Sequence, residues 1–547
     1  MLLRKAIVAI VLSAPLGASS AYAQFPVPSP PPFPPQIKRV VVVFQENRTP
    51  DNLFHFLTPA CPLPVNSNPL EACTPEQVTN SCYNISPCGL SNQSGTITPV
   101  TLKAYPIGGT IDPDHSHTGF NNMCDPDPTT QQCRVDGAWK TSSPAGSSYA
   151  YVQNAAVTNS DGSSGHLLDP YLTMVKNYGW ANFMYQTNQG PSYPAHQFMF
   201  SGTSAMTADD DTNSTFVSEN FNNKIVSNNA GCLALEGATN DVLSPVVNTP
   251  ADTCKLYSNG SVQECTVSNT ALVYPSQPVG TFCVQHQSIA DILDPHSITW
   301  KYYAPSAGSI WTAPDAIKAI CEPQFVNPGG DPASQLQCTG KEWNANVDVN
   351  NLGTDILRDV ANCNLAKVVW VIPDGQWSDH PPNDLYGPSR VAAVVNAIGN
   401  NPRCPQGTTD AGETYWNDTA IIVTWDDWGG WSDHEPAPYA SALPCTSTNC
   451  LGDYQYGFRV PMVVVSAYTP AGYINNVPHD FGSVLRMIEG VNHLPEGTLG
   501  FADKRATSDL RDFFTLPFPK NYQTIPAQKD ASFFLMQDRP ASDPDDD

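Results

Sequence analysis

The chain has 547 residues, of which 41% are hydrophobic and 10% aromatic, so a sizeable core can form and wholesale disorder is excluded. Its formal net charge is −25, with 51 acidic residues against 26 basic ones, which argues against nucleic acid and anionic membrane surfaces as partners. At about 150 residues per domain, the length suits several domains or one large α/β domain with long insertions.

The first 23 residues are typical of a secretory signal peptide. Arg4 and Lys5 form a short basic start, residues 6–18 are mostly apolar but too few to span a bilayer, and a small-x-small cleavage site ends at Ala23. No later run of about 18 apolar residues predicts a transmembrane segment. We therefore expect a protein exported to the periplasm or the medium, with Gln24 as its first mature residue.

The cysteine pattern agrees with an oxidising compartment. All 16 cysteines follow the signal peptide, their number is even, and no CxxC pair is present, which favours disulfides over a zinc site. Cys445 and Cys450 are close enough in sequence to predict a local disulfide in a loop. The sequence leaves the other pairings open.

Composition divides the mature chain into three parts. Residues 24–36 form a Pro-rich linker, residues 37–525 one large domain, and residues 526–547 a tail whose acidic end is expected to fray. Within the domain, residues 55–165 and 205–290 hold most of the cysteines and many Asn, Ser and Gly residues. We interpret both stretches as disulfide-tied insertions in a single domain.

The remaining pattern predicts an α/β sandwich around a mostly parallel central sheet. Continuous apolar, β-branched runs are typical of strands buried on both faces, and four such runs are present, at residues 40–44, 368–372, 420–425 and 460–465. Helices with Pro near the start or Gly after the end are predicted between them, at residues 169–178, 388–398 and 481–489.

Polar residues follow three of the predicted strands. The first strand leads into Glu46 and Asn47, the second into a segment containing Asp379 and His380, and the third into Asp426 and Asp427. In an open α/β sheet the site lies beyond the carboxyl ends of the strands. Carboxylates and an amide beside imidazoles predict a site for a hard cation with acid–base groups next to it.

These motifs resemble those of a known family. Residues 41–54 (VVVFQENRTPDNLF), 424–434 (TWDDWGGWSDH), 457–466 (GFRVPMVVVS) and 480–489 (DFGSVLRMIE) resemble, in order and spacing, motifs of the phosphoesterase family. That family includes bacterial phospholipases C and acid phosphatases and belongs to the alkaline-phosphatase-like superfamily. The resemblance covers most of residues 37–515 and implies the fold and the hydrolase activity of that superfamily.

The resemblance also implies a nucleophile. The family carries a Ser or Thr in a Gly-Pro-Ser/Thr segment, and Gly190-Pro191-Ser192 matches it. A Ser after Gly-Pro is expected at a tight turn that begins a helix, where backbone N–H groups and the helix dipole can hold a phosphate. Ser192 is therefore the predicted nucleophile of a phosphoseryl mechanism.

The other site residues are assigned by the same resemblance. Glu46, Asn47, Asp426 and Asp427 match the metal ligands, and Ser192 completes the set when it is deprotonated. These oxygen ligands predict one divalent ion such as Ca²⁺, Mg²⁺ or Mn²⁺.

Acid–base roles fall to two histidines. His115 and His380 match histidines of the family and are the candidates for protonating the leaving group and contacting phosphate oxygens. Asp433 and His434 match a motif position to which we assign a structural role.

The chain departs from the family in two places, of which the first concerns packing under the site and the second leaves the substrate open. Thr49-Pro50 replaces a usual Ser-Phe, and residues 300–320 lack the adjacent His-His pair that some acid phosphatases carry there. The substrate is thus a phosphomonoester or a phosphodiester such as a phospholipid headgroup. Alternatives are a sulfatase-like hydrolase, although no Cys/Ser-x-Pro-x-Arg segment is present, and a non-catalytic secreted binding protein on a hydrolase scaffold. Oligomeric state stays open.

Overall fold

The fold is that of a computed structural model, which describes most of the chain after residue 31. The described ranges are residues 32–60, 83–127, 132–212, 216–219, 230–234, 241–243, 252–258, 261–267, 272–273, 283–326, 336–438 and 455–542. The predicted signal peptide, most of the Pro-rich linker, the Cys445/Cys450 pair and the end of the acidic tail lie outside these ranges.

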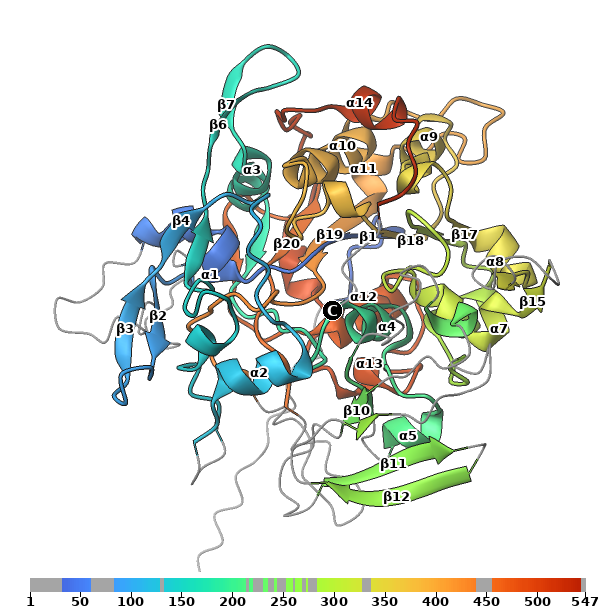
Figure 1. The fold of residues 1–547 in the computed structure, drawn as a ribbon. Helices are drawn as coiled ribbons and strands as arrows, with labels where there is room; N and C mark the ends of the chain where they lie inside the picture. Colours follow the sequence, from blue (N-terminus) through green and yellow to red (C-terminus); the bar gives the residue numbers. More distant parts are fainter. Residues whose placement is uncertain are drawn as a thin grey trace, which may run out of the picture. The chain divides into compact units, whose positions relative to one another are not determined.

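An eight-stranded sheet forms the centre of the domain (Figure 1). Its strands, in spatial order, are β17 (Val347–Asp348), β14 (Trp300–Tyr303), β18 (Val368–Val371), β1 (Arg39–Gln45), β19 (Thr419–Trp425), β20 (Met462–Ser466), β8 (Gly179–Ala181) and β21 (Tyr473–Asn475). All of these strands run in the same direction except β20, which is antiparallel to both of its neighbours. The prediction of a mostly parallel sheet is confirmed.

The four predicted strands are β1, β18, β19 and β20, and they lie side by side in the middle of the sheet. Every residue of these strands is buried, as their unbroken apolar runs require. The fourth run differs from the expectation in direction, because β20 pairs antiparallel with β19. An apolar run records burial on both faces but carries no information on strand direction.

Helices cover both faces of the sheet and complete the sandwich. On one face α10 (Gly387–Asn400) contacts α3 (Asp169–Asn177), α9 (Asp355–Ala361), α11 (Tyr415–Asp418) and α14 (Ala531–Leu535); on the other, α12 (Phe481–Val491) contacts α4 (Ser192–Ser201), α13 (Ala502–Arg505) and β1 (Figure 1). The helices predicted at residues 169–178, 388–398 and 481–489 are thus α3, α10 and α12.

Capping explains where two of these helices begin. Asp480 and Ser483 form a reciprocal capping box at the start of α12. A proline lies in the first turn of α10, where its missing N–H leaves no helical hydrogen bond unmade.

The remaining elements are short. The helices are α1 (Pro50–Leu53), α2 (His117–Cys124), α5 (Ala208–Thr212), α6 (Ile289–Leu293), α7 (Lys318–Cys321) and α8 (Lys341–Asn346). The strands are β2 (Cys88–Ser91), β3 (Thr98–Thr101), β4 (Lys103–Tyr105), β5 (Ala150–Val152), β6 (Ala156–Thr158), β7 (Ser164–His166), β9 (Phe216–Val217), β10 (Asp241–Leu243), β11 (Asp252–Ser258), β12 (Ser261–Val267), β13 (Leu272–Val273), β15 (Pro323–Phe325) and β16 (Leu336–Cys338). Strands β2–β7 and β9–β13 fall in the two stretches predicted as insertions.

Disulfides join cysteines across loops of the described chain. The pairs are Cys124–Cys133, Cys232–Cys283, Cys321–Cys338 and Cys363–Cys404. Cys88 forms no disulfide with another described cysteine. Only the first two pairs lie within the predicted insertions, so cross-linking extends into the sandwich itself. Among the described helices, none is long and apolar enough to cross a bilayer.

Candidate active site

The pairing of β1 with β19 brings together the acidic residues that follow these two strands. Gln45 pairs with Trp425, so Glu46 and Asp426 leave the sheet side by side. The backbone pairing continues past the strands, because the Arg48 N–H donates to the Asp427 carbonyl at 3.0 Å. The sheet geometry therefore brings together the two acidic segments, although they are far apart in the sequence.

Backbone conformation turns both segments around the site. Asn47 has φ 61°, in the left-handed region that Asn tolerates better than most residues, and its N–H donates to Asp426 Oδ1 at 3.0 Å. Gly429 has φ 62°, and a Cβ there would lie 2.3 Å from the Asn47 carbonyl oxygen. The Gly429 position thus permits the close approach of the two turns.

The N-terminus of α4 supplies the predicted nucleophile. Ser192 is the first residue of α4, follows the N-cap Pro191, and is 1% exposed. Its hydroxyl donates to Asp427 Oδ2 at 3.2 Å, while Asp427 Oδ1 accepts from the Gly429 N–H at 2.7 Å. The carboxylate of Asp427 is thereby fixed against the Ser192 hydroxyl.

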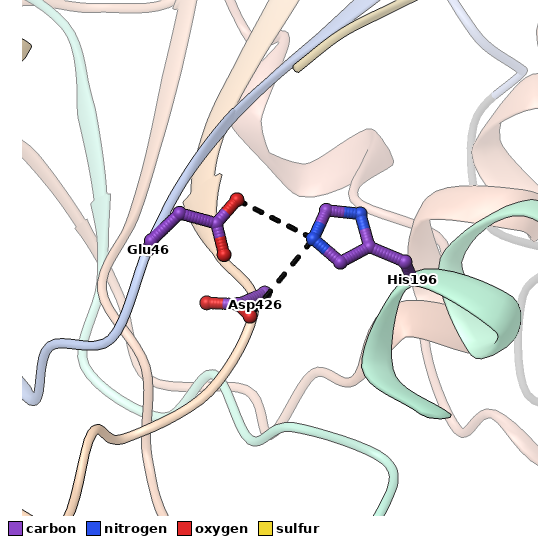
Figure 2. Close-up of side chains that lie close together, drawn as sticks. All are labelled: Glu46, His196 and Asp426. Carbon is purple, nitrogen blue, oxygen red and sulfur yellow. Dashed lines mark ion pairs between the residues drawn. The ribbon is translucent and has the colours of Figure 1, made fainter. Parts of the chain in front are cut away.

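His196 is a site residue that the sequence analysis missed. It lies one helical turn after Ser192 on the same face of α4. Its Nε2 is 3.3 Å from Glu46 Oε1 and 3.9 Å from Asp426 Oδ2, and all three side chains are buried (Figure 2). Ligand atoms of these three residues lie within 4.8 Å of one another.

The electrostatics of this cluster favour a cation. Burial, and next the charge of Asp426, raises the pKa of Glu46 well above its ordinary value. Burial lowers the pKa of His196 to about 4, although Asp426 acts in the opposite direction, so the imidazole is neutral and able to act as a ligand. Both Glu46 carboxylate oxygens, Asn47 Oδ1 and Asp426 Oδ2 are buried and have no hydrogen-bond partner among the described residues. Unpaired buried oxygens of this kind fit a divalent ion.

His115 is held beside the predicted ligands. Its Nδ1 lies 2.9 Å from the Pro113 carbonyl oxygen, and its Nε2 lies 2.9 Å from Asn47 Nδ2. This network assigns the proton to Nδ1, which leaves Nε2 to accept from the Asn47 amide. Asn47 Oδ1 is then the end of the amide that remains for a cation. His115 therefore orients a predicted ligand.

His380 lies next to His115, with their ring centroids 5.8 Å apart. Its Nε2 is 3.8 Å from Asp112 Oδ2, and it follows β18, the neighbour of β1 in the sheet. Both predicted acid–base histidines thus lie at the same edge of the sheet as the acidic segments. Trp311, from the stretch without a His-His pair, lies 6.5 Å from the His380 ring and 6.3 Å from the His196 ring, centroid to centroid.

Asp433 and His434 belong to a separate buried network. His434 Nδ1 is 2.7 Å from Asp51 Oδ2 and its Nε2 is 3.0 Å from Asn84 Oδ1, while Arg459 donates to both oxygens of Asp433 at 2.9 and 3.0 Å. These five side chains satisfy one another's charges and hydrogen bonds. Buried charges need such pairing, and the structural role of Asp433 and His434 stays a prediction.

Comparisons with known proteins agree with the motifs. The model of the Phosphoesterase family matches residues 37–495. A non-hemolytic phospholipase C of Pseudomonas aeruginosa is 28% identical over 34% of the chain and 29% of its own length. Phospholipase C A of Mycobacterium tuberculosis is 28% identical over 42% of the chain and 43% of its own length. The chain thus spans less than half the length of these two relatives.

Among solved structures, a Vibrio parahaemolyticus protein of the alkaline phosphatase superfamily aligns with 61% of the chain and 62% of its own. The TM-score is 0.28 and the sequence identity 8%. The fold class therefore rests on the sheet topology described above.

Proposed function

The chain belongs to the Phosphoesterase family, and we propose that it is an exported, metal-dependent hydrolase of phosphoric esters that works through a phosphoseryl intermediate. The observation that carries the proposal is the Ser192 hydroxyl at the start of α4, which donates to Asp427 beside buried oxygens that have no hydrogen-bond partner among the described residues. A nucleophile, a base and a cation-binding group are the parts that covalent phosphoryl transfer needs.

Each of the site residues has a separate role in the proposed reaction. Glu46, Asn47, Asp426 and Asp427 would hold the divalent ion, which when bound lowers the pKa of the Ser192 hydroxyl and offsets charge on the phosphoryl oxygens. Ser192 Oγ attacks phosphorus and passes its proton to Asp427 Oδ2, its hydrogen-bond acceptor, while the bond from phosphorus to the leaving oxygen breaks. The α4 N-terminus adds a favourable dipole for the phosphoryl oxygens. Water then hydrolyses the phosphoserine.

Leaving-group protonation is proposed for His380, with His115 as the alternative, because the Pro113 carbonyl and the Asn47 amide already use both His115 nitrogens. We expect His115→Ala and His380→Ala to reduce kcat by on the order of 10²–10⁴-fold, the range for general acid–base groups. His115→Ala should also weaken metal binding, because the imidazole orients the Asn47 amide. Steady-state kinetics on substrates whose leaving groups differ in pKa identify the residue that acts as the acid. The variant without that residue should lose least activity when the leaving group is 4-nitrophenolate, because this group needs no proton. If neither variant depends on leaving-group pKa, a histidine acid is ruled out.

For the substrate, we propose a phosphodiester of the phospholipid-headgroup type. The relatives named above are called phospholipases C. In addition, the stretch that carries a His-His pair in some acid phosphatases contributes the uncharged Trp311 near His196 and His380. A phosphodiester carries one negative charge where a monoester carries two, so it needs fewer cationic contacts.

Turnover of p-nitrophenyl phosphorylcholine against p-nitrophenyl phosphate tests this choice, with p-nitrophenyl sulfate as the control for a sulfatase. The proposal expects a higher kcat/KM for the phosphorylcholine ester and none for the sulfate. Preference for the monoester would make the protein a phosphatase. Absence of all three activities in metal-loaded protein would favour a non-catalytic binding protein.

Export is proposed from the signal-like N-terminus and the disulfides. We expect the full chain, expressed with its first 23 residues in a bacterium with an oxidising periplasm, to begin at Gln24 after export. N-terminal sequencing checks the cleavage site, and thiol titration of the denatured, unreduced protein should find few of the 16 cysteines free. Uncleaved protein with mostly free thiols would refute the proposal.

A further inference from the structure

The helix that carries the predicted nucleophile also places an imidazole nitrogen among the acidic residues. Ser192 and His196 share one face of α4, and the Ser192 hydroxyl donates to Asp427. The His196 side chain reaches Glu46 and Asp426 (Figure 2). Figure 2 shows the same ring nitrogen of His196, Nε2, facing both the Glu46 and the Asp426 carboxylate. One helical turn thus supplies both an oxygen and a nitrogen donor.

The ring of His196 is fixed by packing. Its centroid lies 5.1 Å from that of Phe44, the penultimate residue of β1, and 6.3 Å from that of Trp311. Neither His196 nitrogen has a hydrogen-bond partner among the described residues. The aromatic contacts therefore hold Nε2 toward the two carboxylates without using its lone pair in a hydrogen bond.

The spacing of these atoms suits coordination. Two ligand atoms about 2.1 Å from one ion are separated by about 3.0–3.4 Å at octahedral or tetrahedral angles. Glu46 Oε1 and His196 Nε2 are 3.3 Å apart, within that range. The 3.9 Å to Asp426 Oδ2 requires only a small side-chain movement.

We infer that His196 is an additional metal ligand, which makes the site a mixed nitrogen–oxygen centre that prefers a transition-metal ion such as Zn²⁺ to Ca²⁺. The inference rests on the proposed metal dependence and refines the expectation from sequence, which considered oxygen ligands alone. Imidazole suits Zn²⁺, whereas Ca²⁺ takes oxygen ligands almost exclusively. The alternative role is a protonated His196 that pairs with Glu46, and such a cation would oppose metal binding.

Calorimetric titration of the chelator-treated full chain with Zn²⁺ and with Ca²⁺ tests the inference. We expect at least hundredfold tighter binding of Zn²⁺. His196→Gln replaces the nitrogen donor by an amide oxygen, so the ratio of Zn²⁺ to Ca²⁺ affinity should fall at least tenfold. His196→Phe keeps a ring against Phe44 and Trp311 but offers no donor, so Zn²⁺ affinity should fall at least tenfold as well. His166→Asn, an exposed histidine on β7, is the matched control and should change neither affinity.

The possible outcomes separate the inference from the proposed function. Unchanged affinities in both His196 variants, with metal bound by the wild type, would overturn the inference and leave the proposed function standing. Tighter metal binding in both variants would overturn it in favour of the protonated, charge-pairing role. If the wild type bound neither ion, the proposed metal dependence would fail together with the inference.

Discussion

Ser192→Ala is expected to reduce kcat by on the order of 10⁴–10⁶-fold, the scale of loss when a nucleophile is removed. The variant lacks only one hydroxyl at the start of α4, and the carboxylate of Asp427 keeps its hydrogen bond from the Gly429 N–H. The fold and most of the metal affinity should therefore survive. Stopped and continuous assays with a p-nitrophenyl ester, together with metal analysis, measure both properties.

The matched control for this variant is Ser201→Ala. Ser201 ends the same helix, is equally buried, and its hydroxyl has no hydrogen-bond partner among the described residues. Activity should be unchanged in the control. Near wild-type kcat in Ser192→Ala, or an equal loss in both variants, would contradict the assignment of the nucleophile.

Asp427→Ala is expected to remove both metal and activity. Asp427 is a predicted ligand and also accepts the Ser192 hydroxyl proton in its hydrogen bond, so the substitution removes a ligand and the base together. We expect at least a tenfold loss of metal affinity and a loss of kcat comparable to that of Ser192→Ala. Metal content after dialysis and steady-state kinetics measure the two effects.

Asp161→Asn provides the control, since Asp161 is an exposed carboxylate in the loop between β6 and β7. Its metal content and kcat should match those of the wild type. Full metal content and full activity in Asp427→Ala would show that the ion is held by other residues. Metal loss with retained activity would instead separate metal binding from catalysis.

The closeness of the acidic residues after β1 and β19 could be predicted because the ends of buried strands can be located in the sequence. Unbroken apolar runs located β1 and β19, and their parallel pairing puts Glu46 beside Asp426 without any further information. The left-handed turn at Asn47 and the close contact of Gly429 lie just beyond the paired strands. Sheet register is thus the physical link between motif and geometry.

His196 could not be recognised in the same way. It lies within the largely apolar helix α4, where a histidine is indistinguishable in sequence from a core residue. The available signal was its spacing of four from Ser192, which places both on one face of a helix. The motif around His115 indicated acid–base chemistry, whereas its contact with Asn47 adds an orienting role that becomes visible only in the fold.

The direction of one strand and the disulfide pairings also could not be predicted from the sequence pattern. The apolar run of β20 gave no sign of its antiparallel course, because burial on both faces is compatible with either direction. Cysteine number predicted disulfides but not pairings such as Cys363–Cys404, which join residues 41 positions apart. Such pairings depend on how distant loops meet after folding.

The most direct test of the account is mass spectrometry of the wild-type enzyme quenched in acid during turnover. Acid preserves a phosphoserine ester, so the proposed mechanism predicts one phosphate on the peptide that contains Ser192, present with substrate and absent without it. The Ser192→Ala protein should give no phosphopeptide. Rapid turnover by the wild type with no phosphate on any peptide, together with an active Ser192→Ala variant, would contradict the phosphoseryl intermediate and indicate direct attack of water on the ester.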